Sequence, residues 1–279
     1  MRTIDLRTAS VLDRATVEAA VPRAEISVEA VTAQVRPLLE DVAQRGEAAL
    51  LDQAEQFDKV RPAQVRVPAE ALTRAAAALA PEVTLAMKVA IERVRRVHAA
   101  QVPPDGTVEL APGATVSQRW IPVQRVGLYA PGGLAAYPSS VIMNVVPAQE
   151  AGVSELAVAS PPRPEHGGLP HPSVLAACEL LGVKEVYAAG GVSAIGLFAY
   201  GVKGLSAKVD VVTGPGNVYV AAAKRLVAGQ VGIDAEAGPT EIAIVADAGA
   251  DPELVAADLV SQAEHDQLAA AVLITDSPE

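Results

Sequence analysis

Two residues near the end of the chain have the types and spacing of a cation site. The segment PELVAADLVSQAEHD, residues 252–266, has the apolar spacing of a helix and contains Gln262 and His265. Residues three apart on a helix project from the same face, so an amide and an imidazole would lie side by side. A histidine near a helix C-terminus is nevertheless more often a partner of the helix dipole than a metal ligand. The spacing alone therefore leaves metal binding open and favours the structural role.

The other three histidines have surroundings that favour no metal site. His98 ends an amphipathic segment among several arginines, which indicates a solvated position. His166 and His171 lie in the loop PPRPEHGGLPHP at 161–172, where no cluster of carboxylates is near in sequence. As a pair they could bind a metal ion, but the pattern favours an ordinary loop.

Three glycine-rich turns stand where a strand should lead into a helix. They are YAPGGLAAYPSS (129–140), AAGGVSAIG (188–196) and TGPGNVYV (213–220). In a parallel sheet such turns lie at the carboxyl ends of strands, where ligands bind, and glycine lets the backbone approach a ligand closely. Asn217 is expected at the N-cap of the next helix, whose free N–H groups attract anions. Glycines are common in such turns, and no G-x-G-x-x-G fingerprint follows a strand, so the turns suggest a cofactor without identifying it.

Cys178 is the only cysteine of the chain. No internal disulfide can form, which fits a reducing cytoplasm. A lone thiol could act as the nucleophile of a metal-free aldehyde dehydrogenase. However, Cys178 lies in the apolar helical stretch LAACELL, where a packed and inert thiol is the favoured interpretation.

The elements that must position these residues change in character along the chain. Helical spacing of apolar residues occupies 28–56, where Pro37 and Gly46 interrupt it, and continues at about 69–80 and 82–100. Beyond about residue 114, short β-branched runs alternate with alanine-rich helical segments. Repeated strand–helix–strand units predict an α/β fold, with a parallel sheet covered on both faces by helices and a helical N-terminal lead-in.

Composition and charge exclude several classes of protein. The chain has 279 residues and a formal net charge of −11, and the acidic excess lies beyond residue 100. An acidic chain without a basic stripe does not suit nucleic acid. The N-terminal MRTIDLRTAS lacks the apolar region of a signal peptide, and no apolar run reaches the length of a membrane span. We therefore expect a cytoplasmic protein that binds neither nucleic acid nor a membrane.

Four segments, in this order, resemble the histidinol dehydrogenase family: PGGLAAYPSSVIMN, GPGNVYVAAAKR, AGPTEIAIVAD and ADLVSQAEHD. The resemblance runs from about residue 25 to the end of the chain. It implies an oxidoreductase that converts L-histidinol to L-histidine through L-histidinal, the last steps of histidine biosynthesis. It further implies two successive hydride transfers to NAD, one zinc ion per subunit, and a homodimer. In fold, it implies two lobes of incomplete Rossmann-like sheet.

The resemblance also assigns roles to individual residues. Zinc and the substrate would be held by Gln262 and His265, and Thr240 would contact the substrate. NAD contacts are implied for Tyr129 and Asn217. In the family the zinc fixes the amine and imidazole of the substrate, so that the carbinol faces the nicotinamide.

Two departures from the family pattern matter. Ser193 stands where the family commonly has a glutamine that contacts NAD, so that contact is not carried over. The family's Glu-His pair, which holds the general base, and two further zinc ligands belong to positions beyond residue 279. We therefore expect residues 1–279 to be a truncated portion with no catalytic residue of its own, and with an exposed apolar surface that alters its oligomeric state or solubility. A non-catalytic, truncated nucleotide-binding or dimerising module is the alternative.

A change in the sequence near AEAGPTE (235–241) marks the expected boundary between lobes. On this interpretation, residues 1–24 form an N-terminal arm. Residues 25–128 with 236–279 form the first, truncated lobe, and residues 129–235 form a second, inserted Rossmann-like lobe.

Overall fold

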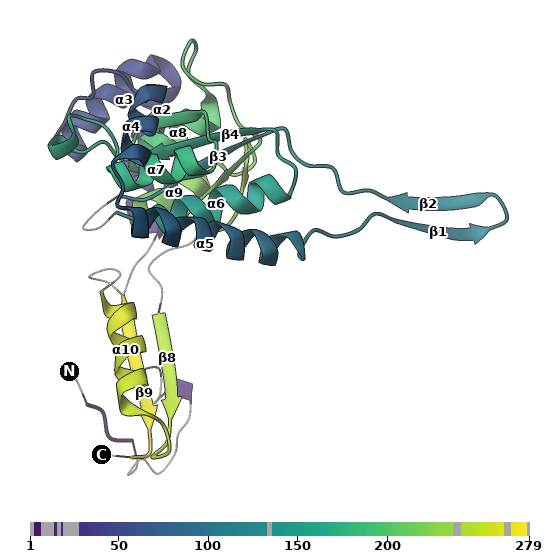
Figure 1. The fold of residues 1–279 in the computed structure, drawn as a ribbon, viewed down its shortest axis with the longest axis vertical. Helices are drawn as coiled ribbons and strands as arrows, with labels where there is room; N and C mark the ends of the chain where they lie inside the picture. Colours follow the sequence, from purple (N-terminus) through teal and green to yellow (C-terminus); the bar gives the residue numbers. More distant parts are fainter. Residues whose placement is uncertain are drawn as a thin grey trace. The chain divides into compact units, whose positions relative to one another are not determined.

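The computed structural model describes residues 3–6, 14, 15, 18, 28–132, 136–236, 241–264 and 269–277. The chain divides into two compact units. One is Val28–Gly238, and the other combines Met1–Ser27 with Pro239–Glu279. Figure 1 shows the elements of both.

The larger unit is built on a five-stranded parallel sheet. Its strands are β3 (Arg125–Tyr129), β4 (Glu155–Ser160), β5 (Glu185–Ala188), β6 (Val211–Thr213) and β7 (Gly232–Ile233). The spatial order is β5-β4-β3-β6-β7, and every neighbouring pair is parallel. The chain therefore builds outward from β3 on one side and then returns to build outward on the other. This reversal makes the gap between the ends of β3 and β6 a topological switch point, where ligands bind in such sheets.

Helices cover both faces of this sheet (Figure 1). One face carries α2 (Val28–Arg45), α3 (Glu47–Gln53), α8 (Gly191–Tyr200) and α9 (Val218–Val227). The other face carries α4 (Ala69–Ala77), α5 (Pro81–Ala99), α6 (Pro138–Glu150) and α7 (Pro172–Leu180). A short 3₁₀ turn, η2 (Pro164–His166), lies between β4 and α7. The α/β class, the parallel sheet, the two helical layers and the helical N-terminal region are confirmed.

The strands divide their side chains between the two cores by simple alternation. Val126 and Leu128 of β3 pack into the core under α6 and α7, whereas Tyr129 packs under α8 and α9. Successive side chains of a strand point to opposite faces, so a strand that is apolar throughout must be covered on both. All five residues of β3 are buried, and its one charged residue, Arg125, forms ion pairs with Glu155 and Glu185.

The N-terminal helices match the predicted segments, but their boundaries differ. Helix α2 continues through Pro37 to Arg45, although an interior proline removes one backbone donor. The helix breaks at Gly46, where the sequence also predicts an interruption, because its φ of 57° leaves the helical region. After α3 the chain forms a π-helical turn, η1 (Ala54–Asp58), and then Lys59 takes a left-handed φ of 61°.

A β-hairpin that the sequence analysis did not predict precedes the sheet. Strands β1 (Gly106–Ala111) and β2 (Ala114–Gln118) pair antiparallel, and every residue of both is exposed. Figure 1 shows the hairpin extending away from the sheet and helices. The signal that could have revealed it is the pair Pro112-Gly113, since Gly113 supplies the positive φ of 77° that a tight turn needs.

The smaller unit contains one strand–helix–strand motif. Strands β8 (Glu241–Ala246) and β9 (Ala270–Thr275) are parallel, with Glu241 opposite Ala270, and α10 (Pro252–Ala263) connects them. Apolar side chains are exposed here, including Val245 at 80% and Ile274 at 52%. Among the described residues of this motif none is fully buried.

The division into units differs from the predicted lobes over residues 28–128. These residues share a compact unit with 129–235, because α2 packs against α8 and α9, and α4 packs against α7. The observed boundary, between Gly238 and Pro239, falls within the 235–241 segment where the sequence changes. A lobe that joins 25–128 to 236–279 stays a prediction.

Across the described part of the chain, no helix combines the length and apolar character that a bilayer span requires.

Gly127 of β3 offers a direct test of this packing. A Cβ at this position would overlap the ring of Phe198 on α8, so Gly127→Ala should lower the free energy of unfolding by roughly 1–3 kcal/mol. The matched control is Gly106→Ala on the hairpin, where a Cβ would meet no atom within 4 Å. Urea unfolding of the two variants measures the difference. Equal stabilities would contradict the packing of α8 on the sheet.

Candidate functional site

The ends of β3 and β6 meet at the switch point through a glycine. Gly214 follows β6 with a φ of 122°, and a Cβ there would overlap the carbonyl oxygen of Tyr129 at the end of β3. L side chains rarely adopt such a φ, so both the conformation and the space require glycine. The turn after β6 therefore lies directly against the turn after β3.

A buried lysine holds this turn in place. Lys224 of α9 is 1% exposed, and its Nζ donates to the carbonyl oxygen of Gly214 at 3.0 Å. The same ammonium group forms an ion pair with Asp234, whose Oδ2 accepts from the amide of Gly214 at 2.9 Å. The backbone C=O and N–H of Gly214 are thus both bound within one small network. A buried charge with such partners favours one conformation of the turn.

Asn217 occupies the predicted N-cap of α9. Its Oδ1 accepts from the amides of Tyr219 and Val220, each at 3.1 Å. The side chain is exposed, and its NH₂ group has no acceptor among the described residues. The oxygen therefore serves the helix while two N–H donors remain for a ligand.

Tyr129 is placed at the same edge but is 4% exposed. Its phenolic oxygen accepts from the amide of Gly191, the first residue of α8, at 3.1 Å. Burial raises the pKa of Tyr129 to about 12, so the hydroxyl stays protonated. Within the described chain its O–H proton has no acceptor.

Asp58 also lies at this edge of the sheet, and the sequence analysis did not identify it. Both carboxylate oxygens lie 3.1 Å from the point that a Cβ on Gly190 would occupy, beside Pro161. Burial raises the pKa of Asp58 to about 6. No hydrogen bond or ion pair engages this carboxylate among the described residues. Perturbed carboxyls of this kind gather at functional sites, but no spacing in the sequence links Asp58 to Gly190.

The glycine-rich turns at 129–140, 188–196 and 213–220 follow β3, β5 and β6, so the structure brings all three to one edge of the sheet. Residues 133–135 of the first turn lie outside the described residues. Ser193 in the second turn is 3% exposed, and its hydroxyl donates to the carbonyl of Gly190 at 2.7 Å. This hydroxyl is therefore engaged inside the first turn of α8.

The histidines of the 161–172 loop have structural partners. His171 caps α7 by accepting from the amide of Ser173, and its ring meets that of His166 edge to face at 5.1 Å. Burial lowers the pKa of His171. Among the described residues, no three His, Cys, Asp or Glu side chains gather closely enough to hold a metal ion.

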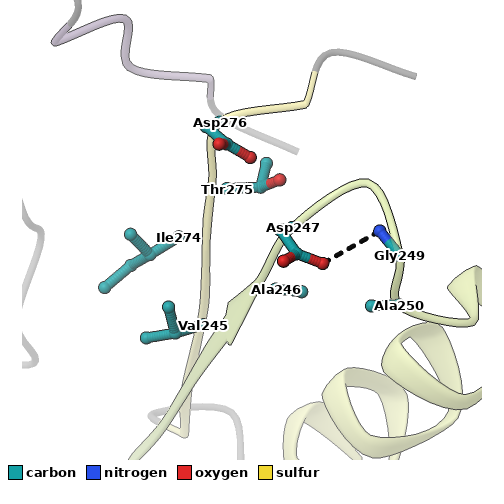
Figure 2. A pocket seen from close by; sticks show the side chains of 8 residues that line it. All are labelled: Val245, Ala246, Asp247, Gly249, Ala250, Ile274, Thr275 and Asp276. Atoms are coloured by element: carbon teal, nitrogen blue, oxygen red, sulfur yellow. Dashed lines mark hydrogen bonds between the residues drawn. The ribbon is translucent and has the colours of Figure 1, made fainter.

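An open hollow of about 720 Å³ lies at the carboxyl ends of β8 and β9 (Figure 2). Asp247 faces it and accepts from the amide of Gly249 at 2.9 Å, and Thr275 and Asp276 line it from the other strand. Gln262 does not line this hollow. It lies in the last turn of α10, whereas the hollow lies at the first, about 15 Å away along the helix axis.

Comparison with known proteins shows the family. A family profile described as histidinol dehydrogenase matches residues 21–279. The chain belongs to the histidinol dehydrogenase family. It is 62% identical over 259 residues to a histidinol dehydrogenase of Thermobifida fusca (strain YX), covering 93% of this chain and 59% of the relative. It is 58% identical over 281 residues to a histidinol dehydrogenase of Mycolicibacterium smegmatis, covering 99% and 63%.

A solved structure agrees with this assignment. The crystal structure of histidinol dehydrogenase from Elizabethkingia anophelis aligns with a TM-score of 0.87 at 33% identity, covering 95% of this chain and 61% of that one. The chain thus spans about three fifths of the length of the histidinol dehydrogenases that it matches.

Two residues implied by the likeness to histidinol dehydrogenases, Thr240 and His265, lie outside the described residues. Helix α10 ends at Ala263, so the helical spacing argument for Gln262 and His265 is not tested. Gln262 itself is partly exposed. The predicted site residues therefore fall into two groups: Tyr129 and Asn217 at the switch point, and Gln262 in the smaller unit.

Cys178 is packed and inaccessible, unlike a catalytic thiol. It is 0% exposed within α7, and burial raises its pKa to about 12. Because the thiolate is the reactive form, a disulfide reagent at pH 8 should modify the native histidinol dehydrogenase chain far more slowly than the chain in guanidinium chloride. Reaction of Cys178 at the same rate in both conditions would contradict this burial.

The raised pKa of Asp58 predicts a pH-dependent stability. Between about pH 4 and pH 6 the folded state binds more protons at Asp58 than the unfolded state, so the carboxyl lowers stability as pH rises and keeps it lower above pH 6. Asp58→Asn should therefore stabilise the chain more at pH 8 than at pH 4.5, by roughly 1–2 kcal/mol after allowance for solvent screening.

Denaturant unfolding at the two pH values measures this difference, and Asp41 supplies the control. A hydrogen bond from Arg45 lowers the pKa of Asp41. Both pH values lie above the ordinary pKa of an aspartate, so Asp41→Asn should change stability by nearly the same amount at pH 8 and at pH 4.5. A pH-independent effect of Asp58→Asn would contradict the burial of this carboxyl.

Proposed function

We propose that the protein containing residues 1–279 oxidises L-histidinol to L-histidine through L-histidinal, in histidine biosynthesis. The observation that carries the proposal is membership of the histidinol dehydrogenase family over residues 21–279. The switch point of the five-stranded sheet supports it, since this is where such sheets bind dinucleotides.

The cofactor that we propose for this edge is NAD, which accepts the hydride in each oxidation step when bound. The residues present fit a dinucleotide. Gly214 keeps the turn after β6 free of side chain atoms, and Asn217 presents two N–H donors at the start of α9. Tyr129 supports the same edge through its bond to the amide of Gly191 and keeps an O–H donor available.

Zinc and the substrate are proposed for Gln262 and His265, with Thr240 as a further substrate contact. Support comes from the topology of the smaller unit. Glu241, which follows Thr240 in sequence, pairs with Ala270 at the start of β9, and α10 returns the chain to that end from Pro252 to Ala263. The described donors do not complete a four-coordinate zinc site, and we propose that further ligands come from residues outside 1–279.

Residues 1–279 by themselves are proposed to bind NAD without turnover. The family resemblance puts the general base beyond these residues, and removal of the carbinol proton needs a base within hydrogen-bond reach. A homodimer in the cytoplasm is proposed for the complete protein. The second candidate is a non-catalytic nucleotide-binding or dimerising module, which the intact switch point also suits.

Calorimetry with NAD tests the assignment of Asn217. Asn217→Ala removes both the N–H donors and the helix cap, whereas Asn217→Ser keeps a capping oxygen. Both variants should bind NAD about tenfold more weakly, because one ligand hydrogen bond is lost. Only Asn217→Ala should also lose about 1 kcal/mol of stability.

The outcomes separate the two candidates. NADH absorbance should stay flat when L-histidinol and NAD are added to residues 1–279, and should rise for a chain extended to the length of its relatives. If the extended chain also fails to reduce NAD, the non-catalytic module is favoured. An unchanged NAD affinity in Asn217→Ser would contradict the proposed contact.

A further inference from the structure

Asp58 lies at the carboxyl ends of the strands, although it is far in sequence from the turns that follow them. It is the last residue of the π-helical turn η1, and the left-handed Lys59 follows it. Single π-helical turns often occur at functional sites. The turn places the Asp58 carboxylate over Gly190, the N-cap of α8, which directly follows β5 and Ala189.

The surroundings of this carboxylate leave its acceptors unused. Within the described chain no hydrogen bond or ion pair reaches it, although it is half-buried. The Asp58 oxygens are not among the fully buried side-chain atoms that lack a partner, so they are open to solvent and can accept hydrogen bonds from a ligand. The O–H of Tyr129 is likewise without an acceptor there.

The topology indicates which ligand group would supply the donors. In doubly wound dinucleotide-binding sheets, an acidic residue at the end of the strand next to the first one receives the ribose hydroxyls. Here the first strand is β3 and that neighbour is β4, which ends at Ser160 and continues into Pro161 and Pro162. None of these carries a carboxylate. Pro161 packs 3.0 Å from the same Cβ position on Gly190 that Asp58 approaches.

We propose that Asp58 accepts hydrogen bonds from the ribose hydroxyls of NAD and excludes the 2′-phosphate of NADP by charge repulsion. This inference rests on the proposed binding of NAD at the same edge. It makes Asp58 a specificity-determining residue. It also explains why the Asp58 carboxylate lies at the carboxyl ends of the strands although it lowers stability there. Acidic residues that bind ribose hydroxyls favour NAD, whereas an arginine accommodates the 2′-phosphate.

Calorimetry with NAD and with NADP tests the proposal on the chain of residues 1–279. The unsubstituted chain should bind NAD more than tenfold more tightly than NADP, since a 2′-phosphate would meet an unpaired carboxylate. Asp58→Asn should weaken NAD binding about tenfold and bring the two affinities within about threefold of each other. The same variant should be more stable at pH 8, so a loss of NAD affinity cannot come from unfolding.

Asp52→Asn is the matched control. It removes the same charge six residues earlier, from an exposed carboxylate paired with Arg45 and Arg61, and should leave the NAD to NADP ratio unchanged. An unchanged ratio in Asp58→Asn would overturn the role of Asp58 while leaving NAD binding intact. Binding of neither nucleotide to the unsubstituted chain would instead overturn the proposed NAD site, and the role of Asp58 with it.

Discussion

The edge of the sheet where β3 and β6 end depends on the buried charge of Lys224. Its ammonium group binds the carbonyl of Gly214 and pairs with Asp234, which in turn receives the amide of Gly214. These bonds hold a turn whose φ is open only to glycine against the backbone of Tyr129. Asn217, three residues after Gly214, then caps the start of α9. A charge buried in a network of this kind contributes more to a unique geometry than to net stability.

The same edge carries groups that the fold alone does not need. The NH₂ of Asn217, the O–H of Tyr129 and the carboxylate of Asp58 lack partners among the described residues, although the rest of the larger unit is tightly packed. Proteins tolerate such groups where a ligand completes them. This agrees with the dinucleotide that we propose for the switch point, and it distinguishes this edge from the ion-pair cluster of Arg125, Glu155 and Glu185 at the opposite ends of the strands.

The smaller unit has a different character. A parallel pair of strands with one connecting helix buries little apolar surface, and Val245 is 80% exposed. Two-stranded sheets are marginal by themselves. The matching histidinol dehydrogenases are longer than this chain by a wide margin. The proposed zinc and substrate residues belong to this unit, so their chemistry is the part of the function that most needs the complete protein.

The sequence by itself determined the α/β class, the helical N-terminal region, the three glycine-rich turns and the family, because apolar periodicity and ordered motifs are local properties of the chain. It also predicted the cap at Asn217, since a cap involves only the next three residues. It could not show that α2 and α4 pack in the same unit as β3 to β7, that residues 106–118 form a hairpin extending away from the sheet, or that the hollow at the ends of β8 and β9 lies away from Gln262. Only the tertiary structure decided that Asp58 meets Gly190 and that Lys224 binds Gly214. The physical reason is that these contacts join residues whose distance in space is set by helix packing and strand order, neither of which leaves a periodic trace in the sequence.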